Sequence, residues 1–89
     1  MRGAFLVLYM FTVYILYSDN LDQFYVGHTG NLDNRIKRHN QGRSKSTKTG
    51  VPWKLMYSEK FDSKSEAYQR EMYIKRMKSR TFIEKLITG

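Results

Sequence analysis

Two apolar segments, rich in β-branched and aromatic residues, follow one another near the start of the chain at residues 11–18 and 23–28. The four residues between them, 19–22 (Asp-Asn-Leu-Asp), form a short polar connection that suits a β-hairpin. This hairpin is the strongest constraint on the fold, because the remainder of the chain must complete and cover its sheet. With 89 residues in total, there is room for one small core and one domain.

Helical and strand-like segments then alternate along the rest of the chain. Asn31 can cap a helix and Gly42 can end it. Ser63 and Glu66 match a capping box, in which each side chain satisfies a free backbone donor of the other. The expected elements are a helix from Asn31 to about Gln41, a loop over 43–52, a strand over 53–61, a helix from Ser63 to about Lys78 and a helix from about Arg80 to Ile87. The order strand-strand-helix-strand-helix-helix predicts an α/β (α+β) domain, with a three-stranded sheet flanked by helices.

The segment 4–17 is apolar apart from Thr12 and follows Arg2, so two interpretations are open. It resembles a signal-peptide core and is too short for a membrane-spanning helix. Its β-branched and aromatic residues, with no small-x-small cleavage pattern after them, favour a strand. We also expect that translation can begin at Met10, which makes residues 1–9 an N-terminal extension and residues 10–89 a single domain.

Positive charge dominates the second part of the chain. The formal net charge is +8, and residues 31–89 carry fifteen basic and six acidic side chains. This excess favours a polyanionic partner, nucleic acid first and an anionic membrane surface second, against the alternative of a merely soluble basic surface. The chain has no cysteine, which excludes disulfides and thiolate metal sites and is compatible with the cytoplasmic location that we expect.

The first predicted helix carries polar groups on the face that should meet the sheet. Leu32, Arg35, Ile36 and His39 fall at i, i+3, i+4 and i+7 and therefore share one stripe. An Arg held against a sheet can offer paired donors to a phosphate. The alternative is an Arg whose head reaches solvent and a His satisfied by a nearby carbonyl.

The second long helix has a similar anomaly with the opposite charge. Ala67, Glu71, Ile74 and Lys78 form a stripe, so Glu71 borders an apolar face. A carboxylate in that position needs a partner, because burying it unpaired is costly. It can pair with Arg35, or it can be a ligand for a hard divalent ion such as Mg²⁺.

Two of the seven tyrosines stand out, because Tyr14 and Tyr25 lie in the two strands of the predicted hairpin. Their hydroxyls converge on one face if the strand register allows it. A phenol near a metal and cationic groups can have its pKa lowered toward a range that is useful for proton abstraction. The alternative for either tyrosine is packing with a hydrogen-bonded hydroxyl.

A basic tract with Ser, Thr and Gly donors follows the hairpin and suits contact with a phosphate backbone. Its six basic residues, uninterrupted by an acidic one, are Arg35, Lys37, Arg38, Arg43, Lys45 and Lys48. No base-reading helix signature accompanies the tract, so sequence-specific recognition is not expected.

Together these features resemble the GIY-YIG endonuclease family over nearly all of residues 11–87. The first tripeptide corresponds to Thr12-Val13-Tyr14 and the second to Tyr25-Val26-Gly27. The matching residues further along are Asn31-Leu32-x-x-Arg35, His39-Asn40, the Ser-Thr-Lys-x-Gly loop, Trp53-Lys54-Leu55 and Ala67-x-x-x-Glu71. In size the chain is similar to the small stand-alone bacterial members, which have no appended DNA-binding domain.

The resemblance implies an antiparallel three-stranded sheet with flanking helices and hydrolysis of a DNA phosphodiester with Mg²⁺ or Mn²⁺. Glu71 would be the sole protein ligand of the metal, Tyr14 the general base, and Tyr25 would orient water or phosphate. Arg35 would stabilise charge on the scissile phosphate, and His39 would join the hydrogen-bond network near the tyrosines. Two departures are that the first tripeptide keeps only its Tyr, and that His28 stands where many members have Lys.

We therefore expect a metal-dependent endonuclease acting on DNA, structured or damaged DNA included, with RNA as a possible substrate and no membrane partner. The expected substrate-binding residues are Gly27, His28, Lys37, Arg38, Arg43, Lys45 and Lys48. One alternative is a nucleic-acid-binding module of the same fold with little or no cleavage. Another is a structural domain whose charge is incidental.

Overall fold

Three antiparallel strands form the sheet at the centre of the molecule. They are β1 (Phe11–Ser18), β2 (Gln23–Thr29) and β3 (Trp53–Phe61), in the spatial order β2-β1-β3. The computed structural model describes residues 10–89. The predictions made for residues 1–9, an extension or part of an apolar segment, lie outside the described residues.

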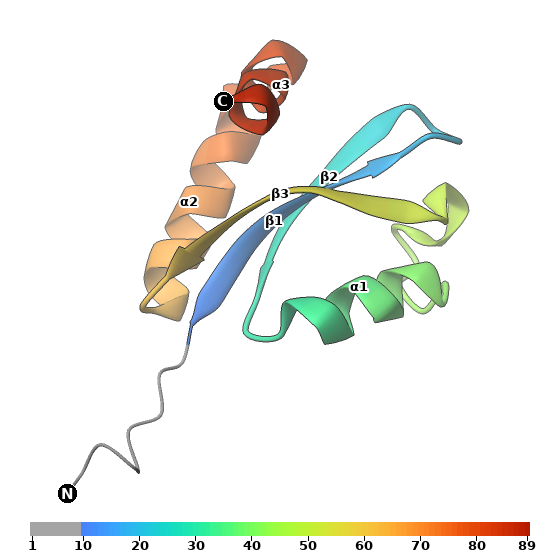
Figure 1. Cartoon of the computed structure of the whole chain (residues 1–89), viewed down its shortest axis with the longest axis horizontal. Coiled ribbons are helices and arrows are strands. Elements are labelled where there is room, and N and C mark those ends of the chain that lie inside the picture. Colours follow the sequence, from blue (N-terminus) through green and yellow to red (C-terminus); the bar gives the residue numbers. More distant parts are fainter. Residues whose placement is uncertain (1–9) are drawn as a thin grey trace, which may run out of the picture.

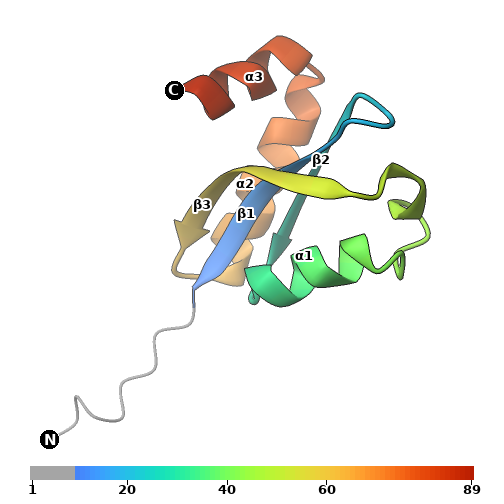
Figure 2. The same ribbon diagram turned by 45° about the vertical axis from the view of Figure 1, so that its right-hand side comes forward.

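Helices cover both faces of the sheet (Figures 1 and 2). On one face lies α1 (Leu32–Asn40), and on the other lie α2 (Lys64–Met77) and α3 (Arg80–Thr88). The predicted order of elements and the antiparallel α+β architecture are thus confirmed. None of the helices between residues 10 and 89 has the length and hydropathy needed to cross a bilayer.

The central strand β1 supplies both cores, because successive side chains of a strand point to opposite faces. Val13 and Ile15 pack under α2 and α3, whereas Tyr14 and Leu16 pack under α1. All four are fully buried. Tyr14 is therefore a core residue of the α1 face as well as a candidate for chemistry.

Side-chain caps begin all three helices. The backbone N–H of Asn34 donates to Asn31 Oδ1 over 3.1 Å, and Ser63 and Ser79 cap α2 and α3 in the same way. These bonds satisfy donors that the first turn of a helix leaves free. The predicted helix starts are confirmed to within one residue.

The connection between α1 and β3 is more ordered than the predicted loop over 43–52, since it contains a short 3₁₀ helix, Lys48–Gly50. Trp53 explains this difference. Its indole Nε1 donates to the carbonyl of Thr47 over 2.7 Å, and its ring lies against Gly50. At the start of β3, the backbone N–H of Trp53 donates to Asn40 Oδ1 over 2.6 Å, which ties the end of α1 to the sheet.

One prediction about α2 is wrong. Lys78 was expected on its apolar stripe, but α2 ends at Met77, and Lys78 is an exposed C-cap residue in the left-handed region with φ of 46°. The chain has to turn here because Ser79 begins α3 directly afterwards. The buried stripe of α2 thus consists of Ala67, Glu71 and Ile74.

We predict that Ile74→Ala destabilises the domain strongly, because Ile74 is 1% exposed and packs against the β1 core. The expected loss is about 2–5 kcal/mol in the free energy of unfolding, measured by chemical denaturation. Met77→Ala is the control on the same helix, since Met77 is 42% exposed, and it should cost about 0.5 kcal/mol or less. Equal losses for the two variants would contradict this packing.

Candidate active site

The phenol of Tyr14 lies across a glycine in the edge strand. The register of β1 and β2 pairs Tyr14 with Gly27, so both lie on the same face of the sheet. A Cβ atom at position 27 would come within 2.6 Å of Tyr14 Oη. Because residue 27 is a glycine, the Tyr14 ring and hydroxyl can lie directly against β2, the edge strand of the sheet.

A buried hydrogen-bond chain starts at this hydroxyl. Tyr14 Oη lies 3.1 Å from His39 Nε2, and His39 Nδ1 lies 2.8 Å from Thr47 Oγ1. His39 is 3% exposed and Thr47 is 1% exposed. Both nitrogens of the imidazole are therefore engaged, which fixes the orientation of the ring. The role of Thr47 was missed in the sequence, although its place in the Ser-Thr-Lys-x-Gly motif was the available signal.

The second tyrosine of the hairpin joins the same cluster. The ring centroids of Tyr14 and Tyr25 are 6.3 Å apart, and Tyr25 meets His39 edge-on at 5.0 Å. Trp53 closes the far side, 6.2 Å from Tyr25. The expectation that the two tyrosines converge on one face is thus confirmed geometrically.

Burial controls the titration of this cluster. Desolvation, with Tyr25 as the next cause, raises the pKa of the Tyr14 hydroxyl to about 12, although the charge of Arg35 acts to lower it. For the protein without a bound ion, the pKa of Tyr14 is thus raised, because desolvation outweighs the single nearby cation; the expected lowering concerns a phenol beside a metal ion and stays a prediction. Burial also lowers the pKa of His39, and the charges of Arg35 and Arg38 lower it further.

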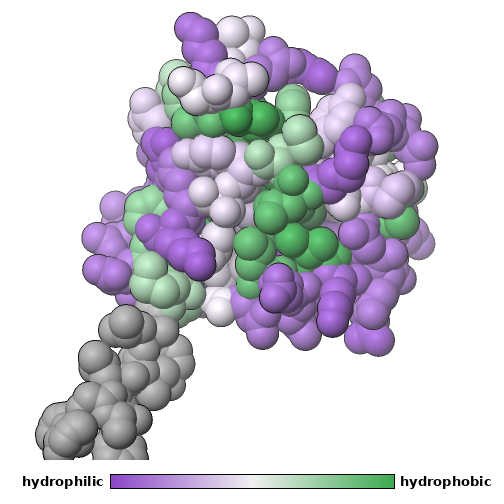
Figure 3. Space-filling view, in the orientation of Figure 1, coloured by the Kyte–Doolittle hydropathy of each residue, from purple (hydrophilic) through white to green (hydrophobic). Residues whose placement is uncertain are grey.

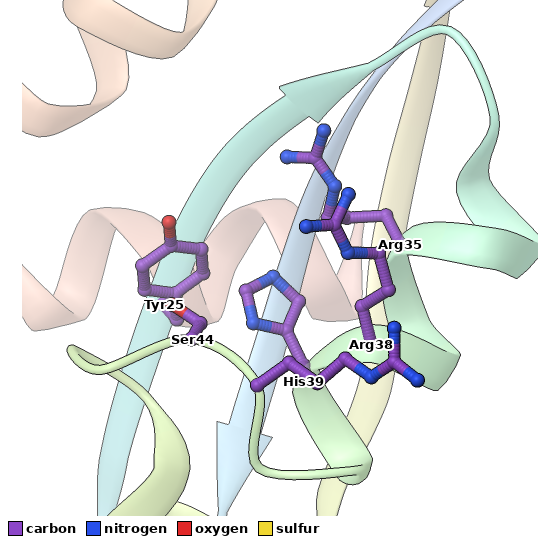
Figure 4. Close-up of a pocket in the computed structure, with 6 residues that line it drawn as sticks. Tyr25, Arg35, Arg38, His39 and Ser44 are labelled. Carbon is purple, nitrogen blue, oxygen red and sulfur yellow. The ribbon is translucent and has the colours of Figure 1, made fainter.

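A pocket of about 270 Å³ opens beside this cluster. It is lined by Tyr25, Arg35, Arg38, His39, Arg43 and Ser44. Figure 4 shows Tyr25 projecting from β2, the two arginines and His39 from α1, and Ser44 from the loop that follows. Arg35 also lines a neighbouring hollow with His28 and Lys64, so it stands between the two.

Glu71 is bound from two sides. His28 Nδ1 lies 2.5 Å from Oε1, and Lys75 Nζ lies 2.5 Å from Oε2. The predicted pairing with Arg35 is not found, because α1 and α2 cover opposite faces of the sheet. The charge of Glu71 nevertheless helps to raise the pKa of Tyr14, so the carboxylate lies within electrostatic range of the phenol. The i,i+4 spacing to Lys75 was a signal that sequence reasoning did not use.

The donor set around Glu71 limits the metals that it suits. Across residues 10–89, no group of three or more His, Asp or Glu side chains is arranged to hold an ion. One carboxylate fits Mg²⁺ or Mn²⁺, which keep water and substrate phosphate as further oxygen ligands. It does not fit a zinc site closed by protein ligands.

The other predicted substrate-binding residues separate into groups. Arg38 and Arg43 meet at the pocket, His28 holds Glu71, and Gly27 lies under the Tyr14 ring. Lys37, Lys45 and Lys48 are exposed but are not among the residues lining the pocket. Hydrophilic residues cover this part of the surface, over α1 and its neighbouring loop (Figure 3).

We predict that stability depends on pH through His39. Its folded pKa is depressed below 6.5, so the stabilisation that it gives as a neutral ring is present above 6.5 and is lost as the pH falls through the folded value. Between pH 7.5 and pH 5, the midpoint temperature of unfolding should fall further for the wild type than for His39→Gln. Thermal denaturation at both pH values measures this difference. Identical losses would contradict burial of the neutral ring.

Comparisons with known proteins agree with this arrangement. A model of the GIY-YIG catalytic domain family matches residues 10–85. The solution NMR structure of the UPF0213 protein BH0048 from Bacillus halodurans superposes with a TM-score of 0.57 at 35% sequence identity. That match covers 89% of this chain and 83% of the other.

Relatives in bacteria and archaea carry the same UPF0213 name. The protein CPE1444 of Clostridium perfringens is 47% identical over 73% of this chain and 70% of its own length. NP_0776A of Natronomonas pharaonis is 40% identical over 74% of this chain and 78% of its own. The match to the relative from Bacillus licheniformis spans 56% of that protein. The GIY-YIG domain is a nuclease-like fold with nucleic acid as its substrate class, and this chain belongs to the GIY-YIG catalytic domain family.

Proposed function

We propose that the protein is a divalent-metal-dependent endonuclease that hydrolyses phosphodiester bonds in DNA. The observation that carries this proposal is the buried contact of 3.1 Å between Tyr14 Oη and His39 Nε2, next to the pocket that Tyr25, Arg35 and His39 line. A guanidinium and a carboxylate, from Arg35 and Glu71, lie within electrostatic range of the same phenol.

The raised pKa of Tyr14 determines how the phenol can act as a base. With a pKa of about 12, the hydroxyl keeps its proton at neutral pH, so it needs an acceptor of its own. His39 is suited to that task, because its lowered pKa keeps the imidazole neutral. In the tautomer that the proposal uses, Nδ1–H donates to Thr47 Oγ1 and Nε2 accepts from the Tyr14 hydroxyl; the two contacts are 2.8 Å and 3.1 Å long.

The proposed step is a relay of one proton. As the attacking water bonds to phosphorus, it gives a proton to Tyr14 Oη, and Tyr14 passes its own proton to His39 Nε2. The bond from phosphorus to the leaving oxygen breaks, and that oxygen takes a proton from solvent. His39 then returns its proton to solvent, so the atoms and charges balance over the cycle.

Developing charge on the phosphate is stabilised by the other two groups. Arg35 offers paired N–H donors to the non-bridging oxygens, a geometry that suits phosphate. Glu71 would hold a Mg²⁺ or Mn²⁺ ion, which supplies Lewis-acid stabilisation of the phosphate when it is bound. In the absence of that ion, His28 and Lys75 hold the two oxygens of the carboxylate. Tyr25 lies beside the path of the phosphate and would orient it.

The basic surface alone supports a second candidate, a nucleic-acid-binding module with little cleavage. Both oxygens of Glu71 have cationic or imidazole neighbours, so this carboxylate has a possible structural role. The two candidates separate at Glu71 and Tyr14, since binding through the basic residues needs neither of them.

We predict that Glu71→Gln and Tyr14→Phe each remain folded and bind DNA but lose metal-dependent nicking by about 10²–10⁴-fold. The measurement is nicking of plasmid, branched and single-stranded DNA with and without Mg²⁺ or Mn²⁺, beside binding by fluorescence anisotropy. Glu66→Gln is the matched control, because Glu66 is an exposed carboxylate on the same helix.

Cleavage that persists in Glu71→Gln would refute the single-carboxylate mechanism. Wild-type protein that binds all three DNA forms but cuts none of them would favour the binding module. A parallel series with RNA of the same sequence decides between the two nucleic acids.

A further inference from the structure

Three guanidinium groups meet around the pocket at the end of α1. They belong to Arg35, Arg38 and Arg43, and Ser44 adds a hydroxyl to the lining of the pocket. Figure 4 labels Arg35, Arg38 and Ser44. In the described part of the chain, the lining residues of this pocket include no carboxylate. The proposed mechanism uses Arg35 and His39, whereas Arg38, Arg43 and Ser44 take no part in the chemical step.

The local sequence explains why two of these arginines are neighbours. Gly42 has φ of 73°, in the left-handed region, and ends α1. Its N–H donates to the carbonyl of His39 over 3.1 Å, and the N–H of Arg43 donates to the carbonyl of Arg38 over 3.2 Å. This pair of bonds is a Schellman motif. It folds the chain back so that Arg43, five residues after Arg38, lies beside it.

Two of the arginines elsewhere in the fold are paired with carboxylates, whereas Arg76 on α2 has no carboxylate within ion-pair distance among the described residues. Arg70 forms an ion pair with Glu59 at 2.9 Å, and Arg80 forms one with Asp22 at 2.7 Å. Within residues 10–89, neither Arg38 nor Arg43 lies within ion-pair distance of a carboxylate. Their charge therefore gathers at one pocket without an internal counter-ion.

Like charges held close together repel, and an anion between them removes the repulsion. The lowered pKa of His39, to which Arg35 and Arg38 contribute, is a second sign that this positive charge is focused into the pocket. Planar guanidinium groups and a hydroxyl are the donors that bind phosphate oxygens well. An anion with several oxygens thus fits the pocket better than a carboxylate side chain with two.

We infer that this pocket is a second phosphate subsite, which binds a phosphate of the nucleic-acid strand other than the one that is cut. Arg35 lines both this pocket and the hollow next to His28 and Lys64, so the two hollows are adjacent. Adjacent hollows sharing one arginine suit successive phosphates of one strand. The strand would then pass from the α2 side, over the rim of β2, to the end of α1. This assignment of the partner rests on the proposed function.

The test is a titration of the full chain followed by NMR of the arginine Nε–H signals. The probes are inorganic phosphate, thymidine 5′-monophosphate and the dinucleotide TpT, with thymidine as the phosphate-free control. We expect saturable shifts at Arg38 and Arg43 for the phosphate-bearing probes and no such shifts for thymidine. If TpT saturates the pocket, the pocket binds a phosphate within a strand. If only inorganic phosphate and thymidine 5′-monophosphate saturate it, the pocket binds a phosphate at a strand end.

Variants make the test specific to the pocket. Arg38→Gln and Arg43→Gln should each weaken binding of the phosphate probe by about tenfold, the loss expected for a charge-assisted hydrogen bond. Lys85→Gln removes an equal charge from an exposed position on α3 and should leave this binding unchanged. The altered arginines are also exposed, so unchanged unfolding midpoints can verify that all three variants are folded.

Two results would overturn the subsite. One is equal weakening in Arg38→Gln, Arg43→Gln and Lys85→Gln, which is the behaviour of general electrostatics. The other is shifts that fail to saturate and spread evenly over all arginines. Failure of the proposed function gives a different result from both. Wild-type protein that binds the probes at this pocket but never cuts DNA would support the phosphate subsite and refute the nuclease activity.

Discussion

The hydrogen bond between the Tyr14 hydroxyl and the His39 imidazole connects the central strand to α1, and the rest of the site depends on it. It is buried, and Thr47 continues it on the other side of the ring. The indole of Trp53 in turn donates to the carbonyl of Thr47. A single polar chain therefore links β1, α1, the 3₁₀ segment and the start of β3. Since an unpaired buried polar group is costly, each of these elements fixes the position of the next.

Gly27 gives the Tyr14 end of this chain the space that it occupies. A side chain there would collide with the phenol, and Tyr14 would then be only a packing residue of the α1 face. The glycine lies on the edge strand β2, and the Tyr14 hydroxyl packs against it. Glu71 comes from the α2 face with His28 and Lys75, and Arg35 comes from the α1 face. Because the two charges come from opposite faces of the sheet, they do not pair with each other, and in the proposed mechanism the phosphate lies between them.

Much of this architecture could be read from the sequence, because it depends on local signals. Hydrophobic periodicity predicted the strands at 11–18 and 53–61, and capping preferences predicted the helix starts at Asn31 and Ser63. The structure agrees with both. The partners of Glu71 and the direction of the Tyr14 pKa could not be predicted, since they depend on which face each helix covers and on how deeply the strand is buried. Gly42 was a sequence signal for the end of α1. That Arg38 and Arg43 lie next to each other could be recognised only from the backbone hydrogen bonds around this glycine.

The central claim is that Tyr14 and His39 act as one unit in proton transfer. A double-mutant cycle on the single-turnover nicking rate measures this coupling directly, with wild type, Tyr14→Phe, His39→Gln and the double variant in saturating Mg²⁺. If the two residues form one relay, the double variant is within about threefold of the slower single variant, because removing either member already breaks the relay. Losses that multiply in the double variant would show two independent contributions and would contradict the account.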